Sequence, residues 1–409
     1  MGKRISRWVR FLLSAGAAIG LVGQLAQAAS HGKGRAKTAV VVPALAANST
    51  TQAVGIDTQA THAFIEEVET GTVLLDKGAD ERLPPASMAK MMTVYTVFTM
   101  LRDGKAKMSD ELPVSEAAWR TSGSKMFVPL GAKISIDDLL HGAIIQSGND
   151  ACVVLAEGLA GSVEAFVDIM NQKSKEIGLK DTHFTNVDGL PDPNEWSTAR
   201  DLATLAIRTV TDFPEYYKMY SQLDFTFNNI KQGNRNPLLY RNMGADGLKT
   251  GHTEEAGYSL TASLVRGDRR VVMVLGGLPT MKARAEESER LADWAFREFN
   301  DYRLFAAGDK IEEAEVWLGS DARVALTVGK DLVVTLSRSA RKGMEVAAQY
   351  DGPIPAPVKK GESVGQIVVT APDTPPQQAS LVAAADVARE DALPRIATLA
   401  GYLVWGQRR

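Results

Sequence analysis

Apolar and polar positions follow a strand-like pattern near residue 60 and a helical pattern soon afterwards. Two β-prone runs, residues 63–65 and 72–75, flank a Glu-Thr-Gly turn at residues 69–71 and predict a hairpin. After Pro84-Pro85, large apolar residues recur at helical spacing, namely Met88, Met91, Met92, Tyr95 and Phe98. This spacing predicts a buried helix that begins near Ser87.

The rest of the pattern suggests two kinds of architecture. A helix-rich stretch continues to about residue 220, strand character returns at residues 257–262 and 270–276, and residues 286–299 predict a closing helix. This order favours an α+β fold, with an antiparallel sheet flanked by helices. Beyond residue 301, short β-prone runs separated by glycine-containing turns predict a small all-β domain; they are residues 314–318, 324–328, 332–336 and 366–370.

The N-terminus has the pattern of an export signal. Basic residues, among them Arg7 and Arg10, precede an uncharged apolar stretch at residues 11–25, and Ala26-Gln27-Ala28 supplies the small residues that a signal peptidase reads. We predict a signal peptide over residues 1–28 and a flexible leader over residues 29–60. An uncleaved membrane helix is the alternative, but the apolar stretch is shorter than the roughly 20 residues that a span needs.

Composition narrows the functions that remain. A length of 409 residues allows about two domains, and a hydrophobic content of 45% is enough for a sizeable core. The formal net charge of −3, without a dense basic patch, gives no support for binding to nucleic acid. The single Cys152 lies in an apolar run, so we expect a buried structural thiol, and we expect neither a metal site nor a cofactor.

The first candidate motif is Ser87-Met88-Ala89-Lys90, at the predicted start of a helix. Residues at this spacing lie on one helix face, so the Lys90 amine can reach the Ser87 hydroxyl. A serine becomes a good nucleophile when a base takes its proton, and burial lowers the pKa of a lysine towards the range where it can be that base. Backbone N–H groups at the helix start can stabilise an oxyanion. Alone, the string is better explained as an ordinary helix start.

The second motif is Ser147-Gly148-Asn149, which follows an apolar helical run. We expect Gly148 to let the backbone turn sharply, so that the two polar side chains point the same way. Ser147 can then relay a proton between Lys90 and a leaving amine, while Asn149 can hold a substrate amide. A loop with a helix cap would explain this string by itself.

The third motif is Lys249-Thr250-Gly251, followed by His252. Lys249 offers a positive charge beside the serine, and Thr250 can donate a hydrogen bond to a substrate carboxylate. Gly251 lets an extended substrate lie against a strand edge, as in β-strand addition. The backbone N–H groups of Ser87 and His252 would form the oxyanion hole, and the His252 side chain fits polar support better than direct catalysis.

These three motifs, in this order, are those of penicillin-binding proteins and class A β-lactamases. From about residue 60 to residue 385, the chain resembles the low-molecular-weight penicillin-binding proteins of the D-alanyl-D-alanine carboxypeptidase family, the type 5/6 group. Arg284 matches the family arginine that helps to bind a terminal carboxylate. The other segments that carry the resemblance are residues 85–90, 122–127, 146–151 and 246–253.

The resemblance implies an architecture and an activity. It implies a β-lactamase/transpeptidase-like domain over residues 61–300, a small β-sandwich-like domain over 301–388 and an amphipathic membrane-anchor helix over 389–409. The activity would be periplasmic removal of the terminal D-alanine from peptidoglycan pentapeptide stems, which end in D-Ala-D-Ala. Ser87 would form the acyl-enzyme, Lys90 would act as base, and β-lactams would inhibit.

The C-terminal segment carries the weakest signal in the pattern. Its apolar residues can share one helical face, and Trp405 could lie at a membrane interface, so we expect attachment to the outer face of the inner membrane. The segment is short, however, and a packed terminal helix is the alternative.

Three other functions share part of the pattern. A class A β-lactamase needs a glutamate that activates the deacylating water, and the expected Glu-x-x-Leu-Asn string is missing between the second and third motifs. A D,D-endopeptidase acting on peptidoglycan cross-links uses the same site, and the sequence disfavours it only weakly. A catalytically slow penicillin-binding protein is disfavoured because every named catalytic residue is present.

Overall fold

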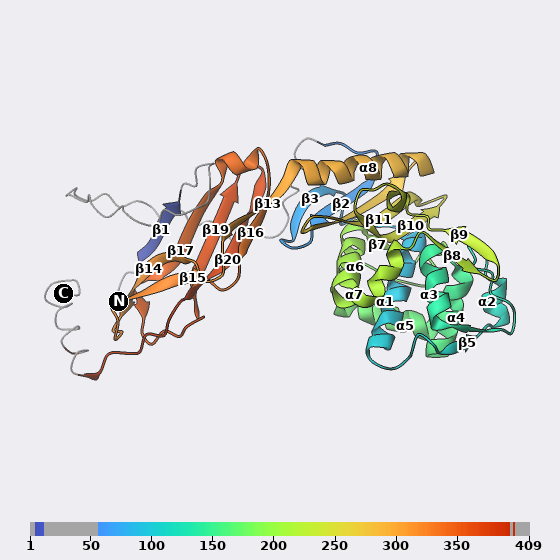
Figure 1. Cartoon of the computed structure of the whole chain (residues 1–409), viewed down its shortest axis with the longest axis horizontal. Coiled ribbons are helices and arrows are strands. Elements are labelled where there is room, and N and C mark those ends of the chain that lie inside the picture. Colours follow the sequence, from blue (N-terminus) through green and yellow to red (C-terminus); the bar gives the residue numbers. More distant parts are fainter. Residues whose placement is uncertain (1–4, 12–55, 393–395, 397–409) are drawn as a thin grey trace. The chain divides into compact units, whose positions relative to one another are not determined.

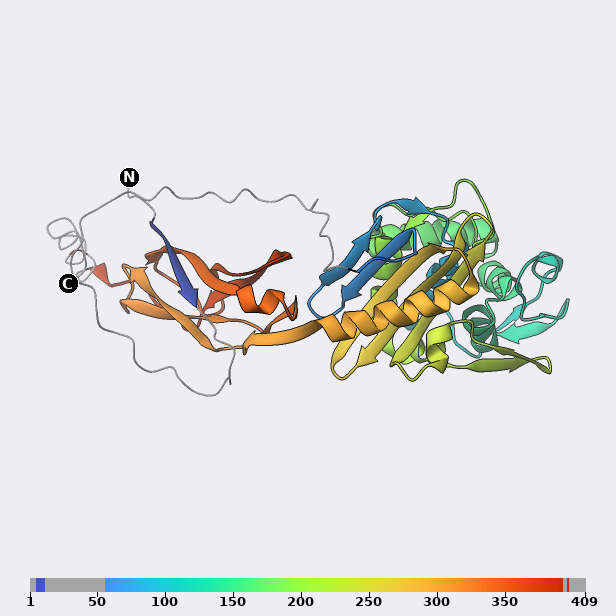
Figure 2. The ribbon, with the colours of Figure 1, turned by 90° about the horizontal axis from the view of Figure 1, so that it is seen from above.

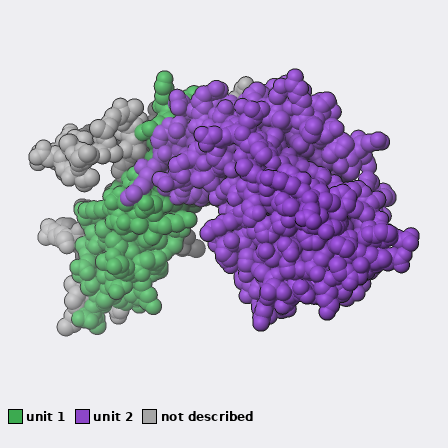
Figure 3. Space-filling model, turned by 45° about the vertical axis from the view of Figure 1, so that its right-hand side comes forward, with its two compact units in different colours: residues 1–51, 304–332, 339–409 green, residues 52–303, 333–338 purple. Residues whose placement is uncertain are grey.

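The computed structural model describes residues 5–11, 56–392 and 396. The chain forms two compact units (Figure 3). Unit 1 comprises residues 1–51, 304–332 and 339–409, and unit 2 comprises residues 52–303 and 333–338. All the candidate site residues belong to unit 2.

A five-stranded antiparallel sheet forms the centre of unit 2, in the order β10-β11-β12-β2-β3 (Figure 2). Its strands are β2 (His62–Glu67), β3 (Thr72–Lys77), β10 (Ala245–Thr253), β11 (Gly257–Arg266) and β12 (Arg269–Leu278). β2 and β3 form the predicted hairpin, and β11 and β12 contain the other predicted strands. β10 is the edge strand, so one side of its backbone is not paired within this sheet.

Helices cover both faces of the sheet (Figure 1). On one face lies α8 (Met281–Glu298), which starts earlier than predicted because the Thr280 side chain caps it by accepting a hydrogen bond from Ala283 N. The helical part on the other face contains α1 (Lys90–Arg102), α2 (Glu116–Arg120), α3 (Ile136–Ile145), α4 (Asn149–Ala160), α5 (Val163–Glu176), α6 (Ala199–Asp212) and α7 (Pro214–Tyr217).

Short elements connect these parts of unit 2. Three 3₁₀ turns are η1 (Ala86–Ala89), η2 (Lys218–Ser221) and η3 (Pro237–Tyr240). The paired short strands are β4 (Arg82–Leu83) with β7 (Ser197–Thr198), β5 (Glu111–Pro113) with β6 (Lys133–Ser135), β8 (Asp224–Phe227) with β9 (Ile230–Gly233), and β13 (Phe299–Phe305) with β16 (Leu332–Ser337).

The sheet separates two hydrophobic cores. Successive side chains of a strand point to opposite faces. Along β12, Val271, Met273 and Leu275 therefore pack with the apolar face of α8, whereas Val272 and Val274 join the core of the helical part. Because both faces are buried, this strand is a continuous apolar run in the sequence. The two cores fix β10 and the start of α1, which carry two of the three motifs.

Unit 1 contains a seven-stranded sheet, which agrees with the predicted all-β character. Its order is β1-β17-β19-β20-β15-β14-β18, with η4 beside it. The elements are β1 (Ile5–Phe11), β14 (Lys310–Trp317), β15 (Arg323–Val328), η4 (Ala340–Gly343), β17 (Glu345–Gly352), β18 (Ile354–Pro355), β19 (Ser363–Ala371) and β20 (Thr374–Ala383). The predicted strand near residue 332 lies in β16, most of which belongs to unit 2.

Both ends of the chain carry predictions that lie largely outside the described residues. Within the predicted signal peptide, only β1 is described, and it pairs antiparallel with β17. Most of the predicted leader and of the predicted anchor helix also lies outside the described residues. The described part of the chain contains no helix that is both long and apolar enough to cross a membrane. Signal-peptide cleavage and membrane attachment therefore stay predictions.

Candidate active site

Ser87 and Lys90 lie one turn apart at the junction of η1 and α1. The Lys90 Nζ donates hydrogen bonds to the Ser87 Oγ at 3.1 Å and to the backbone carbonyl of Asp188. The Lys90 side chain is completely buried at the start of α1. Burial lowers the pKa of its amine below the ordinary value of 10.5. A buried amine in contact with a serine hydroxyl is the arrangement that nucleophilic catalysis requires.

The second motif turns the chain sharply, but at a different residue from the one predicted. Ser147, with φ of 58°, has the left-handed conformation, whereas Gly148 has an ordinary φ of −63°. The prediction for Gly148 was therefore wrong. Glycine is needed there because a Cβ atom would lie 2.9 Å from Asp150 Oδ1 and 3.1 Å from Met126 N. The left-handed conformation of Ser147 is a form of backbone strain that is common at functional sites.

Ser147 connects the second motif to the third. Its Oγ accepts a hydrogen bond of 2.9 Å from Lys249 Nζ, and both side chains are buried. Burial lowers the pKa of Lys249 well below its ordinary value, and the positive charges of Lys90 and Arg235 lower it further. Each of the two serines therefore accepts a hydrogen bond from an amine with a lowered pKa, Ser87 from Lys90 and Ser147 from Lys249.

Asn149 presents an unused hydrogen-bond acceptor. Its Nδ2 donates to the Ser122 carbonyl at 2.8 Å, while its Oδ1 is buried without a hydrogen-bond partner among the described residues. Gly123 packs closely against this amide, since a Cβ at Gly123 would lie 2.7 Å from Asn149 Nδ2. A buried acceptor without a partner is costly, and a substrate N–H would satisfy it.

The third motif lies on the edge strand β10. Thr250 is buried, and a Cβ at Gly251 would lie 3.0 Å from the Pro85 carbonyl, so glycine allows β10 to approach the turn that carries Ser87. The structure thus adds a packing reason to the predicted substrate-facing role of Gly251. His252 is exposed, and its ring stacks on Tyr258 with centroids 3.9 Å apart.

Arg284 and Arg235 add positive charge to Lys249. Arg284 is buried in α8, and its Nε has no hydrogen-bond partner among the described residues. Arg235 was not predicted, and its guanidinium donates a hydrogen bond to Ser124 Oγ at 2.7 Å. Burial is the main cause of the lowered pKa values of Lys249 and Arg284, and the charge of Arg235 lowers both further. In the described chain, no carboxylate forms an ion pair with these three cations. Together they favour the binding of an anion.

Two other expectations concern cysteine and metal. Cys152 is buried as predicted, and burial raises the pKa of its thiol to about 12, so it stays protonated at neutral pH. Within residues 56–392, no group of His, Cys, Asp and Glu has a metal-binding arrangement.

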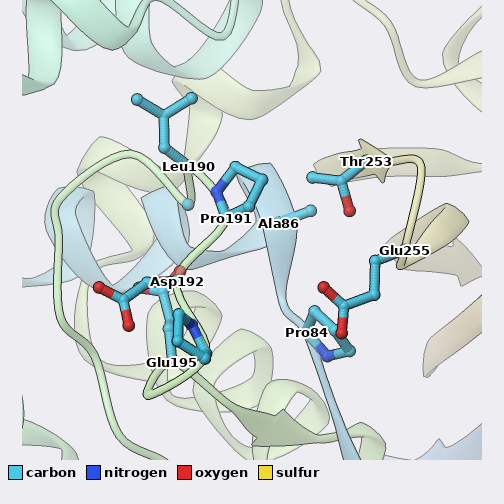
Figure 4. Close-up of a pocket in the computed structure, with 10 residues that line it drawn as sticks. Pro84, Ala86, Leu190, Pro191, Asp192, Glu195, Thr253 and Glu255 are labelled. Carbon is cyan, nitrogen blue, oxygen red and sulfur yellow. The ribbon is translucent and has the colours of Figure 1, made fainter.

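A pocket lies beside the Ser87 turn (Figure 4). Its walls come from the turn at Pro84 and Ala86, from loop residues 189–195, and from Thr253 and Glu255 after the third motif. The pocket therefore lies at the C-terminal end of β10, just after the third motif.

Comparison with known proteins shows the family of the chain. Residues 46–280 match the family model described as D-alanyl-D-alanine carboxypeptidase (Peptidase S11), and residues 299–389 match the C-terminal domain of penicillin-binding protein 5. The chain is 41% identical over 310 residues to D-alanyl-D-alanine carboxypeptidase DacA of Haemophilus influenzae, covering 74% of this chain and 78% of the relative. Identity to DacC of Escherichia coli is 40% over 332 residues, 79% of this chain and 82% of the relative.

A solved structure is also similar. Penicillin-binding protein 5 from Haemophilus influenzae shares 38% sequence identity with a TM-score of 0.75, covering 82% of this chain and 99% of the solved chain. The chain thus belongs to the D-alanyl-D-alanine carboxypeptidase family, a family of serine hydrolases. The resemblance found in the sequence and the predicted α+β fold with an all-β C-terminal domain are confirmed.

Proposed function

We propose that this protein is a serine D-Ala-D-Ala carboxypeptidase that removes the terminal D-alanine from peptidoglycan pentapeptide stems. The observation that carries this proposal is the hydrogen bond from the buried Lys90 amine to the Ser87 hydroxyl. Beside it lie Lys249, Arg235 and Arg284, which form no ion pair with a carboxylate among the described residues. The first feature supplies an activated nucleophile. The second supplies a site for the carboxylate at the end of the stem.

The edge strand β10 sets the direction of the substrate. A terminal carboxylate held by Lys249, Thr250 and Arg284 would let an extended peptide add to β10 as an antiparallel strand. Such a peptide would pass Ser87 and continue towards Thr253 and the pocket of Figure 4. The free Oδ1 of Asn149 would accept one of its backbone N–H groups.

Acylation then proceeds in balanced steps. Lys90 takes the proton of Ser87 Oγ while this oxygen bonds to the carbonyl carbon of the penultimate D-alanine. The backbone N–H groups of Ser87 and His252 stabilise the oxyanion. The bond to the last D-alanine breaks as Lys90 passes this proton through Ser147 to the leaving nitrogen, while Lys249 holds Ser147 by a hydrogen bond. The free D-alanine leaves, and Ser87 holds the acyl group as an ester.

Water then attacks this ester while Lys90 accepts its proton, and Lys90 returns the proton to Ser87 Oγ as the ester bond breaks and the shortened stem leaves. A β-lactam resembles the substrate in presenting an amide near a carboxylate, and its amide is strained, so it would acylate Ser87 and inhibit the enzyme. The carboxypeptidase relatives and the penicillin-binding structure support both parts of this proposal.

We also propose that the protein is exported and acts in the periplasm, attached to the inner membrane through residues 389–409. The export pattern at residues 1–28 and the C-terminal apolar face support this location. Flotation of the purified protein with liposomes tests the attachment, because a version that ends at residue 388 should remain unbound. Equal recovery of both versions with the liposomes would remove this claim.

Release of D-alanine from a pentapeptide ending in D-Ala-D-Ala tests the activity. The wild type should release D-alanine, and Ser87→Ala should not, while Ser221→Ala, an exposed serine outside the site, should match the wild type. Cleavage of a cross-linked dimer without release from the pentapeptide would instead identify an endopeptidase. Rapid hydrolysis of penicillin would identify a β-lactamase.

A further inference from the structure

A loop that none of the three motifs includes holds the Lys90 amine in place. Two backbone hydrogen bonds between His183 and Trp196, of 2.9 and 3.1 Å, close this loop. Within it, the Asn186 Oδ1 accepts hydrogen bonds from Asp188 N at 3.1 Å and Gly189 N at 2.6 Å. The loop thereby fixes the Asp188 carbonyl, which accepts the second hydrogen bond of Lys90.

Two further contacts fasten the loop to the nucleophile's helix. The Thr93 hydroxyl, one turn after Lys90, donates to the Val187 carbonyl at 2.7 Å. Gly189, with φ of 74°, lies so close to η1 that a Cβ atom would be 1.9 Å from the Ala86 carbonyl oxygen. The loop is therefore part of the active-site framework, although it supplies no residue of the three motifs.

This loop buries two carboxyl groups near Lys90. Asp188 and Glu195 are 4% and 6% exposed, and Glu195 borders the pocket beside Ala86 (Figure 4). The Leu190 N–H donates to Asp188 Oδ1 at 3.1 Å, and the Thr185 N–H donates to Glu195 Oε1 at 3.4 Å. Neither carboxyl forms an ion pair within the described residues, and the charges of both act on the buried Lys90 amine.

We propose that Asp188 and Glu195 are positioning residues that control the protonation of Lys90, and through it the rate at which Ser87 is acylated. The inference rests on the proposed role of Lys90 as base. When Lys90 accepts the Ser87 proton, it becomes a buried ammonium, and a nearby carboxylate stabilises that ion. The proton transfer needs no other reactant, because the proton returns to the leaving amine through Ser147.

The charges around Lys90 give the direction of the effect. Burial is the main influence and lowers the pKa of Lys90; Cys152, Asp188 and Glu195 oppose this, whereas Arg235 adds to it. Burial also raises the pKa of Glu195 to about 8, with a smaller contribution from Asp188, so Glu195 changes its charge in the range where a weakened lysine can titrate. Asp192, on the loop itself, and Glu255 line the same pocket, and Lys249 is close enough to Lys90 for the Lys90 charge to lower its pKa.

Above about pH 8, where Glu195 is ionised, replacing it with glutamine removes an anion that favours the ammonium form of Lys90. In that range the pKa of Lys90 should fall, so the rising limb of the pH profile of kcat/KM should move to lower pH. Above this limb the variant should be slower than the wild type, because a less basic amine is a weaker general base. The two profiles should therefore cross.

The experiment measures two rates from pH 5 to pH 10, namely D-alanine release from the pentapeptide and acylation by penicillin. The variants are Glu195→Gln, Asp188→Asn, Glu195→Asp, and the control Glu176→Gln, which makes the same chemical change at an exposed glutamate. We expect crossing profiles for the first two, a midpoint closer to the wild type for Glu195→Asp, and the wild-type midpoint for the control.

The outcomes separate this inference from the proposed function. A uniform loss of rate with an unchanged midpoint in both Glu195→Gln and Asp188→Asn would overturn the inference, since it would show a purely structural role. If the wild type releases no D-alanine, the proposed function fails, and the penicillin rates still decide the inference. If either of these variants does not fold, the other gives the answer.

Discussion

The cores of the two units differ in what they bury. In unit 2, charged side chains are almost completely buried, among them Lys90, Asp188, Lys249 and Arg284. In the described part of unit 1, the buried residues are hydrophobic apart from Thr327. Burying a charge is costly unless partners compensate it. Unit 2 bears this cost around its candidate site, whereas the described core of unit 1 buries no charged side chain.

Replacing Lys90 should produce the largest effect on activity and an opposite effect on stability. We expect Lys90→Met to lower kcat/KM by about 10²- to 10⁴-fold, the usual contribution of a general base. Burial lowers the pKa of Lys90, so the unfolded chain binds the proton more readily. The lysine therefore destabilises the fold at neutral pH, and this cost fades as the pH rises towards 10.5.

The free energy of unfolding at pH 7 should consequently rise in Lys90→Met, and the gain should shrink at higher pH. Urea unfolding at several pH values, together with D-alanine release, measures both effects. Lys105→Met is the control, because its side chain is 71% exposed and should alter neither quantity appreciably. An active Lys90→Met protein would contradict the account. So would a stability of this variant, relative to the wild type, that is lower at pH 7 than at pH 10.

Shortening one buried apolar side chain in the core of unit 1 should lower stability without affecting catalysis. Leu381 is fully buried on β20, so Leu381→Ala should destabilise unit 1 by about 2–5 kcal/mol. Hydrogen exchange of the β20 amides would report this loss, while kcat/KM for the pentapeptide should stay at the wild-type value. Leu264→Ala, equally buried in unit 2, should reduce the thermal stability of the activity itself. A large loss of activity in Leu381→Ala at low temperature would break the comparison.

Removing one cation from the carboxylate site should have a smaller effect. A hydrogen bond to a charged group contributes about 1.5–3 kcal/mol, so Arg284→Ala should lower kcat/KM by roughly 10- to 100-fold. The effect should appear mainly in KM, because the carboxylate is bound in the ground state as well as the transition state. Lys282→Ala, on the same helix with an 83% exposed side chain, is the matched control. Unchanged kinetics in Arg284→Ala would remove this residue from substrate binding.

Local patterns in the sequence were enough to predict much of unit 2. The 3.6-residue period after Ser87, the β2–β3 hairpin and the apolar runs of β11 and β12 depend on neighbouring residues, and the structure confirms them. Each of the three motifs can be recognised in the sequence because its residues lie within four consecutive positions.

Features that depend on tertiary contacts were missed. Arg235 lies in a polar loop without a distinctive sequence pattern, and only the fold brings it to Lys249. Asp188 and Glu195 look like ordinary loop acids until burial places them beside Lys90. The sharp turn was predicted at Gly148 because glycine is the usual residue for such a turn, but the left-handed conformation occurs at Ser147. Glycine is required at position 148 because of its packing against Asp150 and Met126.

The central claim is that Ser87, activated by Lys90, carries the acyl group. Brief incubation of the purified protein with penicillin, followed by proteolysis and mass spectrometry, would locate the covalent adduct. The account predicts one adduct per chain, on Ser87, which is absent from Ser87→Ala and forms much more slowly in Lys90→Met. An adduct on Ser147, or one that still forms rapidly without Lys90, would contradict it.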